Sequence, residues 1–143
     1  MSKGDTFEND LLKLIFNTTA IANIAINATS SPLTSLYLSL HTADPGEAGS
    51  QTTSEISYTG YGRVGVARDS SGFTVSGSTV VLAANATFGQ MTAGAGGTVT
   101  HFALGTASSG AGKILYYGTV TPNLSVSNGV TPILDTTTTF TED

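Results

Sequence analysis

The sequence predicts a mainly β fold, an antiparallel β-sandwich or jelly roll of about eight short strands with one N-terminal α-helix. Stretches in which apolar and polar residues alternate recur along most of the chain, and Gly, Ser, Asn and Pro residues separate them. Only the N-terminal segment carries apolar side chains at helical spacing. We therefore expect two parts in the 143-residue chain: an N-terminal helical arm of residues 1–31 and a β-sandwich domain of residues 32–143.

The helix is expected close to the N-terminus. Asp5 and Glu8, three residues apart, resemble a capping box that starts a helix. Apolar side chains recur at helical spacing at Phe7, Leu11, Leu14, Ile15, Ile21 and Ile24. Threonines at positions 18 and 19 interrupt this stripe, so it predicts one helix or two short ones, ended by the turn formers of residues 27–31 and the proline at position 32. The stripe either docks on the chain's own β-domain or reaches a neighbouring subunit.

The pattern of residues 36–68 predicts a strand, a long turn-rich loop, a short strand and then a second alternating strand. In residues 36–41 three leucines fall on one face and a tyrosine, a serine and a histidine on the other, which is the pattern of a half-buried strand. Residues 61–68 alternate in the same way. The two strands can therefore cover one common core.

The connecting loop, residues 42–54, exceeds the ~4–6 residues typical of a connection, which indicates an interaction surface or a compact Ω-loop. Within it, Asp44, Pro45 and Gly46 suit a type II turn. The acidic residues of this loop lack the tight spacing of a calcium loop, so we expect solvated carboxylates. The candidate partner-binding residues are Asp44, Pro45 and Glu47 of this loop with Phe7, Leu11, Leu14, Ile15 and Ile21 of the helix.

Further short strands follow. Residues 69–72 suit a hairpin turn between strands 61–68 and 73–76, and Asn128-Gly129 suits a type I′ turn pairing residues 124–127 with 130–134. The remaining expected strands are residues 80–82, 86–89, 99–104, 113–120 and the tail around Phe140. Residues 92–97 predict a flexible loop. Both faces of residues 113–120 carry bulky side chains, which predicts a strand buried on both sides or covered on one side by a partner.

The charge distribution indicates protein contacts. The net charge is −5 and only five residues are Lys or Arg, so we expect no binding to nucleic acid, which requires clustered basic residues. Charged residues make up 10 % of the chain against roughly 25 % in an ordinary domain, and Lys113 is the only charge between Ser70 and Leu134. This composition favours a protein that assembles with other proteins; the alternative is a neutral surface hydrated through hydroxyl groups.

The sequence contains few residues in patterns typical of catalysis or metal binding. Cysteine is absent, which excludes a disulfide, a thiolate metal site and a cysteine nucleophile. Strand pairing could bring His41 and His101 together with Asp44, but zinc needs three or four ligands, so we expect half-exposed strand histidines instead. No Gly-x-Ser-x-Gly motif and no pair of carboxylates in acid and base roles is recognisable. We therefore expect neither an enzyme nor a bound cofactor or metal.

The sequence also shows few features of membrane insertion or export. No apolar run approaches the ~20 residues of a membrane helix, so we expect no membrane contact. The first residues lack a basic segment followed by a small-residue cleavage site. The chain is therefore expected to be made and used without export.

Three stretches, LYLSLHTADPGEAGSQTTSEISYTGYGRVGVAR, VTHFALGTASSGAGKILYYGTV and the terminal TED, resemble a family of small virion structural proteins of tailed bacteriophages. The similarity runs over nearly the whole chain, including the helical segment. Members of this family are labelled either head decoration (cement) protein or tail-fibre-like protein. No catalytic residues come with the resemblance.

The resemblance implies a cement protein that is made in the host cytoplasm and binds the major capsid protein on the outer surface of the head. It would bridge capsomers and stabilise the shell, and it would form a homo-oligomer, a dimer or a trimer. The alternative is a tail or fibre component that binds a host-surface glycan. Clustered exposed aromatic residues would favour this alternative, since sugar rings stack on them. The chain has no Trp and five Tyr, which favours the cement role.

Overall fold

The structure, a computed structural model, describes residues 5–21 and 32–141. These residues form one helix and nine strands: α1 (Asp5–Asn17), β1 (Ser35–His41), β2 (Val64–Ala67), β3 (Phe73–Ser76), β4 (Thr79–Leu82), β5 (Ala86–Thr87), β6 (Gly97–Gly105), β7 (Ile114–Val126), β8 (Ile133–Leu134) and β9 (Thr139–Thr141). The pairs β1–β6, β3–β4, β4–β9 and β6–β7 are antiparallel. The predicted class, mainly β with antiparallel sheets and one N-terminal helix, is confirmed.

The chain divides into two compact units. The helical unit comprises Met1–Ser35, Val66–Asn85 and Leu134–Asp143, and the sheet unit comprises Leu36–Gly65 and Ala86–Ile133. The helix thus groups with β3, β4 and β9. The expected division into an arm of residues 1–31 and a domain of residues 32–143 stays a prediction.

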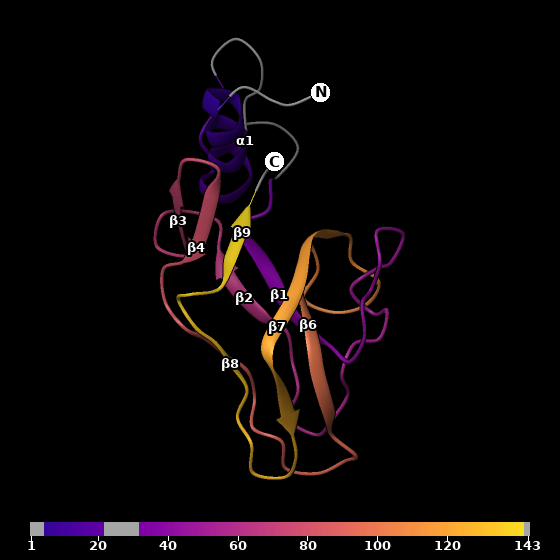
Figure 1. Cartoon of the computed structure of the whole chain (residues 1–143). Helices are drawn as coiled ribbons and strands as arrows, with labels where there is room; N and C mark the ends of the chain where they lie inside the picture. Colours follow the sequence, from indigo (N-terminus) through magenta and orange to yellow (C-terminus); the bar gives the residue numbers. More distant parts are fainter. Residues whose placement is uncertain (1–4, 22–31, 142–143) are drawn as a thin grey trace. The chain divides into compact units, whose positions relative to one another are not determined.

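In the helical unit, α1 packs beside β3 and β4, and the sheet order is β3-β4-β9 (Figure 1). Three aromatic rings form the centre of this packing. Phe16 meets Phe73 edge to face with 4.8 Å between ring centroids, and it lies 5.6 Å from the ring of Phe140. All three rings are buried, and Leu12 is buried with them. The helix is therefore held within its own chain by an aromatic core.

The buried face of α1 differs from the predicted stripe. Phe7 is 41 % exposed, and Leu11, Leu14 and Ile15 are half-buried, whereas the fully buried residues are Leu12 and Phe16. The segment from residue 11 to residue 16 is apolar at every position except 13, so two overlapping stripes exist and the sequence pattern does not distinguish them. Ile21 is buried, and the predicted position Ile24 lies outside the described residues.

The end of α1 combines a local and a distant cap. Thr18 has a positive φ of 55°, which ends the helix, and the Thr19 N–H donates back to the Lys13 carbonyl at 3.1 Å. The last turn of the helix has no basic residue of its own. Arg68 supplies one: its guanidinium donates to the carbonyls of Leu14 (2.8 Å) and Ile15. A cation at this end of a helix is favourable because the carbonyl dipoles point toward it.

In the sheet unit, the main sheet has the strand order β2-β1-β6-β7, and β2 begins in this unit. The β1–β6 register pairs Leu38 with Leu104 and Leu40 with Phe102, and all four side chains are buried on one face. This face is the apolar core that the three leucines of the predicted strand 36–41 indicated.

Both predicted hairpins are wrong, although their turns exist. Residues 69–72 turn as expected, but β3 pairs with β4 and not with β2. At the second turn Gly129 has a φ of +88° and the Val130 N–H donates to the Ser127 carbonyl at 3.0 Å. Beyond it the chain pairs with a distant segment, since the Met91 N–H donates to the Val130 carbonyl at 2.9 Å. Before it, β7 pairs with β6. Backbone partners from distant segments thus decide which strands pair.

Candidate functional site

The long loop of residues 42–54 closes on itself above β1. At its ends the Thr42 N–H donates to the Ser54 carbonyl and the Ile56 N–H to the Leu40 carbonyl, both at 2.9 Å. Gln51 in this loop is fully buried. Residues 42–54 therefore form a compact cover loop over the second face of β1, which matches the Ω-loop alternative of the sequence analysis.

His41 lies beneath this cover, so the expectation of a half-exposed histidine is wrong at this position. Its Nδ1 donates to the Thr53 carbonyl at 2.8 Å, because a carbonyl can only accept, and its Nε2 lies 2.9 Å from the Ser39 hydroxyl. Burial lowers the pKa of His41, and the hydrogen bond to Thr53 opposes this effect. The imidazole is therefore neutral near pH 7, and its Nε2 accepts a hydrogen bond from the Ser39 hydroxyl, which also lies 3.4 Å from the Ala103 carbonyl.

Gln51 joins three segments of the sheet unit. Its Nε2 donates to the Tyr37 carbonyl at 3.2 Å, and its Oε1 accepts from the Ala107 N–H at 3.0 Å. Two glycines make room for the amide: a Cβ at Gly105 or Gly112 would lie 2.2 Å or 2.1 Å from its side chain. Side chains at these two positions would displace Gln51 and break its hydrogen bonds.

Arg63 and Glu55 form an ion pair that, like Gln51, connects distant segments of the sheet unit. Arg63 donates to both carboxylate oxygens of Glu55 at 2.7 Å, in a bidentate pair whose side chains are 3 % and 15 % exposed. The same guanidinium donates to the carbonyls of Ala107 (3.0 Å) and Gly110 (2.8 Å). The hydrogen bonds with Glu55 raise the pKa of Arg63, which stays charged. This pair fixes residues 107–110 to the cover loop.

Tyr61 completes the network. Its hydroxyl donates to Glu55 at 2.9 Å and accepts from the Leu40 N–H at 3.1 Å. Burial raises the pKa of Tyr61 well above its ordinary value, so the phenol stays protonated. Across the residues that the structure describes, every buried polar side-chain atom has a hydrogen-bond partner. The network therefore supports the loop.

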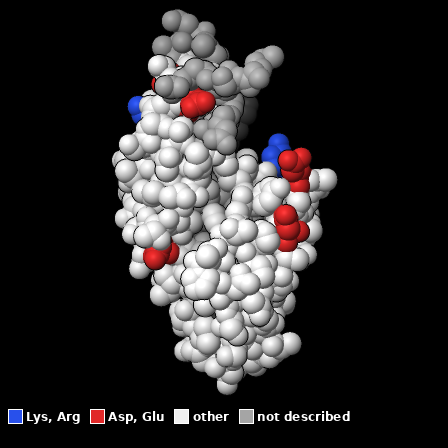
Figure 2. Space-filling model, viewed as in Figure 1, with Lys and Arg blue, Asp and Glu red and all other residues white. Residues whose placement is uncertain are grey.

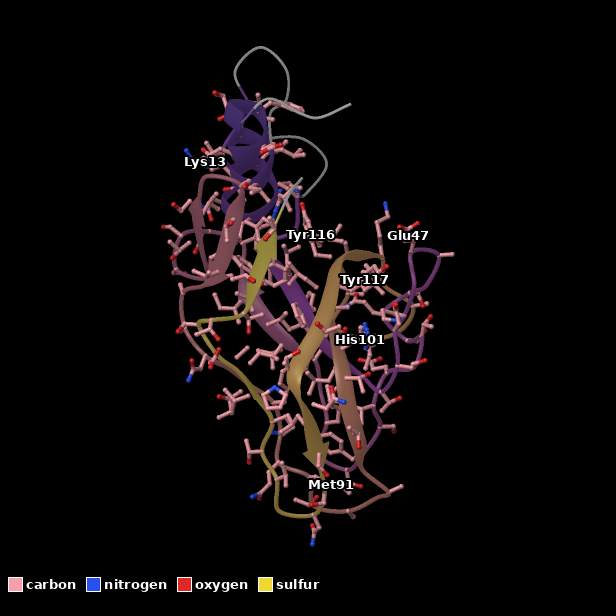
Figure 3. The ribbon with its side chains drawn as sticks, in the orientation of Figure 1. Lys13, Glu47, Met91, His101, Tyr116 and Tyr117 are labelled. Carbon is pink, nitrogen blue, oxygen red and sulfur yellow. The ribbon has the colours of Figure 1, made fainter. Side chains whose placement is uncertain are left out.

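The tip of the cover loop carries the three predicted contact residues. Asp44 and Glu47 are exposed, and Pro45 is buried (Glu47 is labelled in Figure 3). The Asp44 carboxylate accepts from the Gly46 N–H at 2.8 Å, and the Gly49 N–H donates to the Gly46 carbonyl at 3.1 Å. Gly46 has the expected positive φ of 69°, but the hydrogen-bonded turn spans residues 46–49 and not 44–47. The tip thus presents two carboxylates on a turn that Pro45 supports from inside.

The predicted contact residues belong to two different units. Those of the helix, Phe7, Leu11, Leu14, Ile15 and Ile21, lie in the helical unit, and Asp44, Pro45 and Glu47 lie in the sheet unit. Their role in partner binding stays a prediction. Sequence reasoning missed Gln51, Glu55 and Arg63, which hold the loop.

Two arrangements could suggest chemistry. His41 and His101 are partners in the β1–β6 register, as strand pairing allowed, but both nitrogens of His41 have hydrogen bonds. The Ser39–His41 contact resembles the start of a catalytic pair, yet both side chains are fully buried, so no substrate reaches the hydroxyl. Within residues 5–21 and 32–141 no three His, Asp or Glu side chains group to hold a metal ion. No helix in this part of the chain is long and apolar enough to cross a membrane.

The strand β7 differs from its prediction. Its first residues are half-buried, and Tyr117, Thr119 and Thr121 are exposed, so the strand is not buried on both sides (Tyr116 and Tyr117 are labelled in Figure 3). Covering by a partner on one side stays a prediction. Figure 2 shows few charged side chains on a mostly uncharged face. In the sheet unit the charged residues are Asp44, Glu47, Glu55, Arg63 and Lys113.

One protein family matches the chain over residues 2–139. It is described as "Podophage GP4 fiber I protein gp80". No curated protein matches the chain.

Proposed function

Because this chain belongs to the family described as Podophage GP4 fiber I protein gp80, we propose that it is a non-enzymatic structural subunit of a podophage fibre. The family match confirms the resemblance to phage virion structural proteins. The chain is a virion component, and the proposal concerns its place in the particle. The observation that carries the proposal is the match itself, which extends over residues 2–139 of 143.

The geometry of the sheet unit supports a structural role. Its buried polar groups are used to hold the cover loop, and the Ser39–His41 pair is closed to solvent. The surface offers hydroxyl and amide groups with few charges, which suits contacts with other proteins more than contacts with nucleic acid. The proposed partners are other virion proteins and further copies of this chain. Neither membrane nor cofactor forms part of the proposal.

Head decoration is the second candidate. In that role the chain would bind the major capsid protein on the outside of the head and bridge capsomers. Low charge density favours it, because 10 % charged residues is unusual for a surface that faces only water. The loop tip with Asp44 and Glu47 would be its contact region.

Location on the particle separates the two candidates. Virions would be labelled with gold-conjugated antibodies, and the copy number would be measured against the major capsid protein by quantitative mass spectrometry. A fibre subunit predicts label at the tail and far fewer copies than the capsid protein. Label spread over the head, with a copy number close to that of the capsid protein, would establish the decoration role instead.

A deletion gives an independent readout. Particles without a fibre subunit should keep their resistance to heat and low salt but adsorb poorly to cells. Particles without a cement protein should adsorb normally and release DNA more readily on heating. The variant Asp44→Ala/Glu47→Ala tests the loop tip in either role, and Thr74→Ala, exposed on β3, is its matched control.

A further inference from the structure

The strand β7 is an unusually long edge. In the order β2-β1-β6-β7 it has β6 on one side and no further strand of the described residues on the other. It contains 13 residues, with an irregularity in its pairing with β6 between Thr119 and Leu124, whereas the other strands that end a sheet in the described chain contain two to four. Proteins usually keep edge strands short or charged, because free backbone N–H and C=O groups pair with other chains.

This edge also lacks protective charges. Residues 114–133 contain no Asp, Glu, Lys or Arg. Alternate side chains at Tyr117, Thr119 and Thr121 are exposed, and Tyr117 retains 37 % of its surface. A neutral strand with exposed aromatic and β-branched side chains has the composition that favours β-pairing.

We propose that β7 pairs with the β7 of a second copy of this chain, antiparallel across a two-fold axis near Gly118. The pairing extends over residues 115–121, roughly 24 Å of strand, because the axis places residue 115 opposite residue 121, and Pro122, which has no N–H, ends the ladder. In this register Tyr117 lies opposite Thr119 of the second copy, and Tyr116 lies opposite its Val120. Pairs of an aromatic with a β-branched residue are favourable between antiparallel strands.

The neutral edge suits a second copy as the occupant. Across a two-fold axis each residue lies near its own copy, so any charge close to the axis would face a like charge. The nearest charged residue is Lys113, five positions from Gly118. Its two copies would be about 34 Å apart, beyond the Debye length of ~10 Å at 0.1 M salt. This inference rests on the self-association included in the proposed function and names its surface.

The test is the oligomeric state of the purified full chain, measured by light scattering and sedimentation over a dilution series. The wild type should form a dimer. Thr119→Lys places two like charges near the axis and should raise the dimer dissociation constant at least tenfold, with an unchanged circular dichroism spectrum. Thr74→Lys, an exposed threonine on β3, is the matched control and should stay dimeric.

Cross-linking tests the register, because the chain has no cysteine of its own. A mixture of Tyr117→Cys and Thr119→Cys chains should form a mixed disulfide on mild oxidation, and Thr74→Cys chains should not. A monomeric or trimeric wild type, a dimer that Thr119→Lys leaves unchanged, or no mixed disulfide would overturn the proposal. If Thr119→Lys fails to fold, the mixed disulfide between Tyr117→Cys and Thr119→Cys chains decides whether the β7 strands pair. None of these results bears on the location of the protein on virions, which the gold label tests separately.

Discussion

The two units of this chain are stabilised by different interactions. The helical unit has an apolar centre of three phenylalanine rings, and ten of the fifteen charged residues belong to its segments: Lys3, Asp5, Glu8, Asp10, Lys13, Arg68, Asp69, Asp135, Glu142 and Asp143. The sheet unit has five charged residues, and two of them, Glu55 and Arg63, pair with each other away from solvent. The helical unit thus combines an apolar centre with most of the charged residues, while the sheet unit buries one ion pair and, of its charged residues, exposes only Asp44, Glu47 and Lys113.

This difference explains what each unit can do. Apolar packing is non-directional, so the helical unit needs only a good fit of its rings. Hydrogen bonds are directional, and the polar network of the sheet unit fixes one conformation of the cover loop and of residues 107–110. A surface held in one shape and with few charges is suited to repeated contacts with identical or related subunits.

The largest expected effect is the loss of the aromatic centre. Phe16→Ala should lower the free energy of unfolding by about 3–5 kcal/mol, because it removes a fully buried ring from contact with Phe73 and Phe140. Chemical denaturation measures the total, and hydrogen exchange should show faster exchange in β3, β4 and β9. Phe7→Ala, at an exposed position of the same helix, should change stability by no more than ~0.5 kcal/mol.

Hydrogen exchange in the same variant also shows whether the two units unfold separately. Protection of β1 and β6 that stays at the wild-type level would show that the sheet unit does not depend on the helical one. Equal loss of protection in both units would show that they unfold together, and the contrast between them would then be one of composition only.

A smaller effect is expected in the sheet unit. Arg63→Met keeps the apolar stem but leaves the Glu55 carboxylate without its cation, which should cost about 2–3 kcal/mol. The residual exposure of Glu55 places this value below that of a completely buried pair. Hydrogen exchange should increase in residues 105–112, which Arg63 holds through the carbonyls of Ala107 and Gly110.

Two comparison variants sharpen this result. The double variant Arg63→Met/Glu55→Leu should recover part of the loss, since it removes the unpaired charge as well. Lys113→Met removes an exposed charge of the same unit and should have little effect. If Arg63→Met is as stable as Lys113→Met, the ion pair does not hold the loop.

Sequence patterns identified the elements better than their partners. The helix and the strand that became β1 were recognisable because local period decides them. The turn at Asn128-Gly129 was also recognisable, but its flanks pair with β6 and with residues 88–91, which are far away in sequence. Local turn chemistry shows where the chain reverses. It does not determine which backbone groups the next segment meets.

The polar network could not be predicted from the sequence, for a similar reason. Gln51 and Ala107 are 56 residues apart, and Arg63 and Gly110 are 47 apart, so no spacing rule connects them. Two signals were present. Gly105 and Gly112 flank a segment that a buried side chain approaches closely, and Glu55 and Arg63 are opposite charges in a part of the chain with few others. The helix face was missed because residues 11–16 are apolar at nearly every position.

The smallest expected effect is a pH dependence that arises in the sheet unit. Burial lowers the pKa of His41, while Glu55 raises it and Arg63 and His101 lower it further, so the folded chain takes up a proton at lower pH than the unfolded chain, whose histidine titrates near 6.5. Above pH 6.5 neither state is protonated at this site, and the contribution of His41 to stability is complete. As the pH falls below 6.5 the unfolded state binds the proton first, so the free energy of unfolding decreases until the folded pKa is passed.

Asp69 and Asp135 also have lowered pKa values, but they titrate below 3.8 and do not contribute between pH 7 and pH 5. Denaturation midpoints measured from pH 7.5 to pH 5 should therefore decline in the wild type and in His101→Gln, and the decline should be weaker in His41→Gln, which has no proton to bind at this position. A decline of equal slope in His41→Gln would assign the pH dependence to another group and remove the buried histidine from the contrast between the units.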